Sequence, residues 1–228
     1  PRARRTRIES GGRTGARLRA TLACALWICL TVTSDWAVAA QKEIERWAEG
    51  PVRWLLLPGE LKELRNLEAS AGSASYIDVF WRRRDKNPER AGNAFREAFL
   101  ERVEAADLLY VDEGIRGSLT DRGRALILMG SPSHVTVSTE PVMAWDPARE
   151  IEDRVTMRNV DVEIWGYRME DLPSGVLEIW LARKKKAAED TLTLTLMFRA
   201  VGKRTSIVEG EALLEAAAQA AVYQLASD

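Results

Sequence analysis

The sequence predicts an α+β fold, with N-terminal helices packed on an antiparallel sheet of about four strands and a C-terminal helix. Three observations predict this class. Helical patterns fill the chain from Gln41 to Tyr110, and short apolar runs gather after that point. No helical crossover is evident between these runs, which favours antiparallel pairing. An Ala-rich helical pattern then covers residues 211–225.

Breaker residues divide the helical part of the chain. A short helical pattern around Ile44 and Trp47 is interrupted by Gly50 and Pro51. Three further helices are predicted over residues 60–71, 75–84 and 87–110. The last one is the best defined, because its apolar residues recur at steps of three or four. These residues are Phe95, Phe99, Val103, Ala106 and Tyr110.

The second half of the domain reads as strands. Apolar runs bounded by turn residues predict strands over residues 125–129, 160–167, 176–182 and 191–198. The last run alternates Thr with Leu or Phe, which predicts a half-exposed strand with Leu196 and Phe198 facing inward. Residues 136–158 are predicted to be a loop-rich excursion.

Residues 1–40 have the three parts of an export signal. An Arg-rich stretch ends at Arg19, an uncharged run follows from Ala20 to Ser34, and Ala37 to Ala40 form a small-residue cleavage pattern. The run is shorter than the ~20 residues that span a bilayer. We therefore expect a signal peptide cleaved near Ala39-Ala40, a domain over 41–228 with its core at about 52–198, and a periplasmic or secreted product. An uncleaved segment would be the one membrane contact.

Removal of this segment changes the chemistry of the remaining chain. Seven arginines and two acids lie in it, so the rest carries a net charge of about -6, which disfavours nucleic acid as a partner. Both cysteines, Cys24 and Cys29, lie in it as well. The mature domain would then have no disulfide, no Cys-ligated zinc and no thiol nucleophile.

Several sequence blocks occur in the order found in a known family. They are Phe80-Trp81-Arg82-Arg83-Arg84-Asp85, Arg102 with Ala105-Ala106-Asp107, the segment from Gly117 to Arg124, the segment from Leu126 to Pro132, and Glu163-Ile164-Trp165-Gly166-Tyr167. Over roughly Val52 to Phe198 the chain resembles the bacterial GWxTD-domain family. Three departures stand out. Ser118 replaces the signature Trp, Asp107 replaces the usual Asn, and Lys86-Asn87-Pro88 displaces the usual Pro. The resemblance implies an exported or envelope domain and no particular mechanism.

The candidates for binding are polar residues of these blocks and one loop tryptophan: Arg84, Asp85, Arg102, Thr120, Asp121, Arg122 and Trp145. A structural interpretation stands beside each. Thr120 and Asp121 can bond backbone amides in a turn, with Gly123 in a backbone conformation closed to other residues. Arg84 and Asp85 can form a buried network that fixes a helix against the sheet.

No cofactor or metal site is predicted. Gly-rich phosphate-binding motifs are absent from the sequence, and His134 is the only histidine. The acids Asp146, Glu150, Glu152 and Asp153 lack EF-hand spacing and are expected to form a solvated loop.

Two functions remain open at this point. The first is a noncatalytic binding or assembly module outside the cytoplasm, with an envelope or secreted protein as its partner. The alternative is a hydrolytic enzyme that uses carboxylates and arginines around Asp121 and Asp85. Convergence of Asp85, Arg102 and Asp121 on an open cleft would favour the enzyme.

Export is directly testable. When the chain is produced in a bacterial host behind an initiating Met, we expect an envelope or secreted product whose N-terminus lies near Gln41. N-terminal sequencing of the fractionated product measures this. A cytoplasmic product that retains Arg2 to Ala39 would contradict the prediction.

Overall fold

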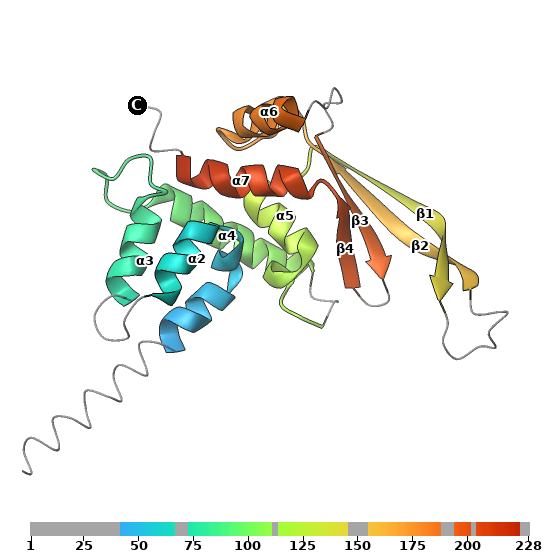
Figure 1. Ribbon diagram of the computed structural model, residues 1–228, viewed down its shortest axis with the longest axis horizontal. Helices are drawn as coiled ribbons and strands as arrows, with labels where there is room; N and C mark the ends of the chain where they lie inside the picture. The colour runs from blue at the N-terminus through green and yellow to red at the C-terminus, as the bar shows by residue number, and fades with distance from the viewer. Residues whose placement is uncertain are drawn as a thin grey trace, which may run out of the picture.

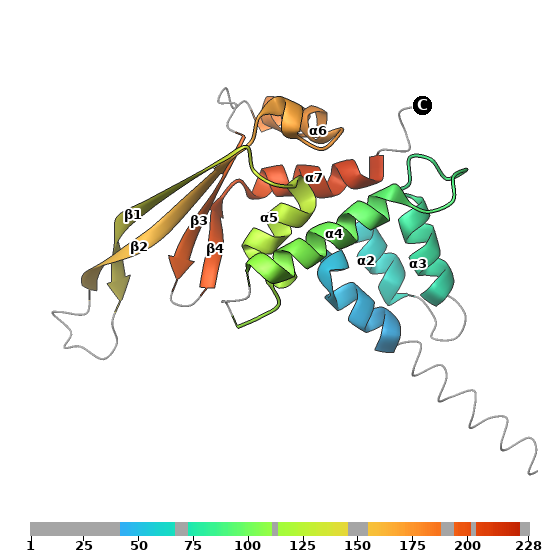
Figure 2. The ribbon, with the colours of Figure 1, turned by 180° about the vertical axis from the view of Figure 1, so that it is seen from behind.

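The computed structural model describes residues 42–66, 73–110, 114–145, 155–187, 194–201 and 204–223. Helices gather at one end of the molecule, and a four-stranded sheet extends from the other (Figure 1). Seen from behind, α4 runs from α3 towards α5 with α7 alongside (Figure 2). The expected segment 1–40 lies outside the described residues.

Among the described residues, most helices precede the strands, two helical elements lie between the second and third strands, and one helix follows the last strand. Residues 42–49 are helical. The elements after them are η1 (Pro51–Trp54), α2 (Pro58–Arg65), α3 (Ser73–Arg82), α4 (Ala94–Leu109), η3 (Gly117–Leu119), α5 (Asp121–Met129), η5 (Met169–Asp171), α6 (Val176–Ala187) and α7 (Glu211–Tyr223).

The sheet is antiparallel throughout, with its strands in chain order β1-β2-β3-β4. Its strands are β1 (His134–Trp145), β2 (Val155–Gly166), β3 (Thr195–Val201) and β4 (Arg204–Glu209). The α+β class, the four antiparallel strands and the C-terminal helix are therefore confirmed. Leu196 and Phe198 are fully buried, as the alternation in their strand predicted.

Two predicted strands are helices. Residues 125–129 belong to α5, and residues 176–182 belong to α6. The run in α5 is apolar at every position because the helix is covered on all sides, so it shows no period that separates helix from strand. In α6 the buried residues Val176 and Trp180 are four apart, which is the spacing of a helix.

The predicted excursion over residues 136–158 is also wrong. It contains most of β1 and the start of β2, which pair with each other over twelve residues. The long helix begins later than predicted, at Ala94. Asn93 is its N-cap, with the side-chain oxygen accepting from Arg96 N–H at 2.9 Å.

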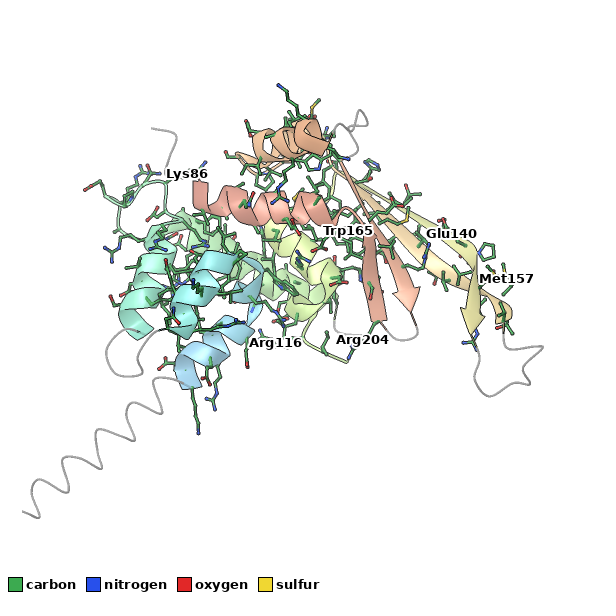
Figure 3. The ribbon with its side chains drawn as sticks, in the orientation of Figure 1. Lys86, Arg116, Glu140, Met157, Trp165 and Arg204 are labelled. Atoms are coloured by element: carbon green, nitrogen blue, oxygen red, sulfur yellow. The ribbon has the colours of Figure 1, made fainter. Side chains whose placement is uncertain are left out.

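The core lies between the helices and one face of the sheet. The ring of Trp165 on β2 packs against Phe198 of β3, with ring centres 4.9 Å apart, and against Tyr110 after α4, with ring centres 6.1 Å apart. Figure 3 shows Trp165 where the sheet meets the helices. Two further core residues come from α7, where Leu213 and Leu214 are buried.

A buried ion pair joins the first helices. The Arg84 side chain is 0% exposed, and its Nη1 and Nη2 donate to Glu60 Oε1 and Oε2 at 3.0 and 2.7 Å. The guanidinium also donates to the carbonyls of Leu55 and Phe80 and lies 3.6 Å from the centre of the Phe80 ring. Arg84 therefore fixes α3 against η1 and α2, and not against the sheet as predicted.

Replacement of Arg84 should show how much the stability of the fold depends on this ion pair. Arg84→Met leaves the buried Glu60 with only the half-exposed Arg83, 3.9 Å away, as a counter-charge. We therefore expect the free energy of unfolding to fall by about 3 kcal/mol in urea denaturation. Arg84→Met combined with Glu60→Gln removes both charges while Gln can still accept from Leu57 N–H. The double variant should recover much of the loss. An equal loss in both variants would contradict the assignment.

Candidate functional site

The signature segment, Gly117 to Arg124, joins α4 to α5 at close range. A Cβ on Gly117 would lie 2.0 Å from the Ala106 carbonyl oxygen, and a Cβ on Gly123 would lie 1.9 Å from the Gly117 oxygen. Thr120 is the N-cap of α5, since its Oγ1 accepts from Gly123 N–H at 3.0 Å and donates to Gly117 O at 2.7 Å. Gly123 is thus required by close packing inside a helix, and not by an unusual backbone conformation.

Asp107 holds the start of this segment. Its Oδ1 accepts from Ser118 N–H at 2.7 Å, and its Oδ2 accepts from the Arg116 guanidinium. Partial burial favours the neutral acid, but the hydrogen bonds from Ser118 and Arg116 outweigh it and lower the pKa of Asp107 below its usual value. Asp107 is therefore a charged anchor for the turn between α4 and α5.

Two charged residues of α5 attach the helix to the sheet. Arg122 Nη1 lies 3.0 Å from Glu163 Oε1 on β2, and Glu163 Oε2 accepts from Trp165 Nε1 at 3.1 Å. Asp121 Oδ2 accepts from Ile207 N–H of β4 at 2.9 Å, where the register between β3 and β4 shifts. The strongest polar cluster of the signature is thus engaged in joining helix to sheet.

Tyr110 packs against the Arg122 side of the same cluster. The Arg122 guanidinium lies 4.8 Å from the centre of the Tyr110 ring. Burial raises the pKa of Tyr110 to about 12, against the opposing influence of the Arg122 charge. The phenol therefore stays neutral at physiological pH.

Ser118 stands where the signature has Trp. Its side chain is fully buried. Its carbonyl accepts from Trp54 Nε1 at 2.8 Å. The Trp54 ring in turn lies about 5 Å from the guanidinium carbons of Arg53 and Arg124. In this chain the position therefore belongs to the core and is not an exposed binding group.

The residues named for a hydrolytic centre occupy separate places. Asp85 Oδ1 accepts from Asn87 N–H at 3.0 Å and lines a shallow hollow beside α3. Arg102 donates to Ile127 O at 3.1 Å inside another cavity, and Asp121 bonds to β4. Trp145 ends β1, and its side chain lies outside the described residues. The condition that favours the enzyme, convergence on one cleft, is not met by these contacts.

A feature that was not predicted from the sequence is the arm formed by β1 and residues 155–161 of β2. β3 pairs only with residues 162–166, so the arm runs on beyond it as two strands (Figure 1). Apolar side chains on the arm are exposed: Val137 66%, Met143 78%, Val155 57% and Met157 64%. Figure 3 places Met157 towards the end of the arm.

These four side chains share one face of the sheet. Met143 is opposite Met157, and Val137 is an even number of residues from Met143. Directly opposite residues of an antiparallel pair lie on the same side, and side chains alternate along a strand. The same face carries Trp165, which is buried under the helices. The arm thus continues the core face of the sheet into solvent.

The fold and the signature segment define an α+β domain with a fixed joint between α4, α5 and the sheet. Residues 49–159 match the family model of the GWxTD domain, so the resemblance is confirmed and the chain carries a GWxTD domain over this range. Glu163 to Tyr167 lie beyond the match. Comparison with curated proteins and with solved structures gave no match.

Within the described residues, no helix combines the length and the apolar character needed to cross a membrane. The same residues also hold no group of three or more His, Cys, Asp or Glu side chains that could bind a metal ion. The acids from Asp146 to Asp153 lie outside the described residues.

The sequence did not reveal two important sets of residues. Glu60, the partner of Arg84, stands 24 positions away, and nothing in its local pattern marks it as buried. The exposed methionines of the arm had a detectable signal. The alternation Val155-Thr156-Met157 and the Val135-Thr136-Val137 run both have the period of a strand.

Substitutions at Asp107 should separate its two contacts. Asp107→Asn can still accept from Ser118 N–H and loses only the exposed ion pair with Arg116, so we expect a cost within about 1 kcal/mol at pH 7. Asp107→Ala also leaves that N–H unpaired, and we expect a total cost of about 1–3 kcal/mol. Urea denaturation of the three proteins measures both values.

The pH dependence gives a second measurement. The folded-state pKa of Asp107 is lowered, so its charge stabilises the fold above the ordinary carboxyl pKa, and this contribution is lost as the pH falls through the folded pKa. The difference between wild type and Asp107→Asn should therefore shrink below about pH 4. A difference that grows in acid would contradict the assignment.

Proposed function

We propose that the domain is a noncatalytic protein-binding module that works outside the cytoplasm, and that the β1–β2 arm is its docking element. One observation carries this proposal. The core face of the sheet continues along the arm, where its apolar side chains are uncovered. The export signal predicted for residues 1–40 supports the location.

The exposed face has an energetic consequence. Exposed apolar side chains that share one face are typical of interaction sites, because covering them gains about 25 cal/mol per Å². A two-stranded ribbon is also only marginally stable in water. A bound partner would therefore both cover Met143 and Met157 and stabilise the arm.

The geometry favours an extended segment of another protein as the occupant. In the described part of the chain, no strand pairs with the outer side of residues 155–161 of β2. This edge contains no proline, whereas β1 carries Pro141 near its middle. Since proline removes a backbone donor from an edge strand, addition of a strand is expected at β2.

A second copy of the chain fits this edge poorly. Antiparallel pairing of two identical edges over all of residues 155–161 would place Arg158 at the centre, opposite Arg158 of the other copy. Like charges directly opposite each other destabilise a strand pair. We therefore assign the edge to a different protein chain, whose alternate apolar side chains pack beside Met157 and Val155.

Photocrosslinking can test the docking element. A photoreactive residue at Met157 should give an adduct with one envelope or secreted protein in cells. The same residue at Met169, which is 62% exposed on η5, should not. The crosslinked peptide is identified by mass spectrometry, and its synthetic form should bind the domain. N-methylation at alternate backbone positions should abolish that binding, because a strand donates to its neighbour at every second residue.

Matched substitutions provide the control. Met157→Asp should remove peptide binding, Met169→Asp should preserve it, and both should change the free energy of unfolding by less than about 0.5 kcal/mol since both sites are exposed. Adducts formed only with a second copy would contradict the partner assignment. Equal adducts from Met157 and Met169 would contradict the arm as the docking element.

A further inference from the structure

A small cavity of about 230 Å³ lies among α4, α5 and α7, apart from the arm. Its walls are mostly apolar and include Phe95 and Phe99 of α4, Leu128 of α5, and Ala217 and Ala221 of α7. Two cationic side chains also line it, Arg102 and Lys86. The cavity thus combines an apolar wall with positive charge.

The Arg102 guanidinium has no carboxylate partner in the part of the chain that the structure describes. Its one hydrogen bond is donated by Nη1 to Ile127 O at 3.1 Å. Burial lowers the pKa of Arg102, which reflects the cost of keeping the charge away from water. Ile127 lies near the C-terminus of α5, where the helix dipole supplies only about half a negative charge.

Other arginines of the domain have a carboxylate partner of the kind that Arg102 lacks among the described residues. Arg84 is paired with Glu60, Arg124 lies 2.7 Å from Glu211, and Arg183 lies 2.7 Å from Glu215. The last two line a wider hollow on another side of the molecule, and each of them is met there by a glutamate. A guanidinium has five donors, and among the described residues Arg102 has one hydrogen-bond acceptor, the carbonyl of Ile127.

Lys86 adds positive charge at another part of the cavity wall. Its Nζ donates to Ser174 Oγ at 3.2 Å, and both side chains are exposed there. Figure 3 shows Lys86 beside the end of α7. An exposed lysine at a cavity raises the local concentration of anions.

We propose that this cavity binds a small aliphatic carboxylate. The carboxylate accepts hydrogen bonds from Arg102, which supplies the missing counter-charge, and the alkyl chain lies along the apolar wall between α4 and α7. The volume is below the ~300 Å³ at which sites for drug-sized ligands begin, so the ligand is a short chain and not a long lipid.

Calorimetric titration of the whole chain with octanoate tests this proposal. Octanoate should bind at one site. Acetate, which lacks the chain, and octanol, which lacks the charge, should each bind at least about tenfold more weakly. Arg102→Met should weaken octanoate binding about tenfold or more, because it removes a charge-assisted hydrogen bond. Arg96→Met is the matched control on the exposed side of the same helix and should bind as wild type does.

A second variant covers the case in which Arg102→Met unfolds. Ala98 lines the cavity and is exposed, so Ala98→Phe should narrow the entrance, preserve the fold and reduce octanoate binding. The proposal is overturned by the absence of octanoate binding, or by equal binding to wild type and Ala98→Phe. Equal affinity for octanol would overturn the role of the charge, and equal affinity for acetate would overturn the role of the apolar wall.

Discussion

The guanidinium of Arg84 is fully buried, and the arrangement of the helices depends on the groups that accept its hydrogen bonds and balance its charge. Its acceptors come from three elements, with Leu55 after η1, Glu60 on α2 and Phe80 on α3. A buried ion pair gives little net stability over an apolar contact, but it tolerates only one geometry. The pair therefore sets the relative positions of the first helices more than it adds to their total stability.

Direct contacts position each of the following elements relative to α3. The ring of Trp81 packs against Phe99 of α4, with ring centres 5.3 Å apart, and the Trp81 carbonyl accepts from the Asn93 side chain at the start of that helix. α4 then approaches α5 through Gly117, where no side chain fits. α5 holds the sheet through Arg122 and Asp121. The signature segment is thus the joint in a continuous series of contacts from η1 to β4.

The sequence was sufficient for the fold class and for the amphipathic helices, because their apolar spacing is a local property. It failed where burial on all sides removes the period, as in residues 125–129, and where strand pairing decides the structure, as in residues 136–158. The blocks around Arg84, Thr120 and Arg122 were identified as important, but their partners were not. Partners such as Glu60 and Glu163 are distant in sequence, and only the packed chain brings them together.

Buried arginines with a structural role differ from a candidate for binding in one respect, which is whether the chain supplies a carboxylate partner. Where a cation is buried to hold elements together, a carboxylate from the same chain meets it, as Glu60 meets Arg84 and Glu163 meets Arg122. An arginine that is mostly buried beside a helix C-terminus, with one carbonyl acceptor, departs from that rule at a cost to stability. Large apolar surfaces are normally covered in the same way, and the exposed face of the arm departs from this rule as well. The two departures lie in different parts of the domain, so an anion at Arg102 and a protein on the arm can be bound together.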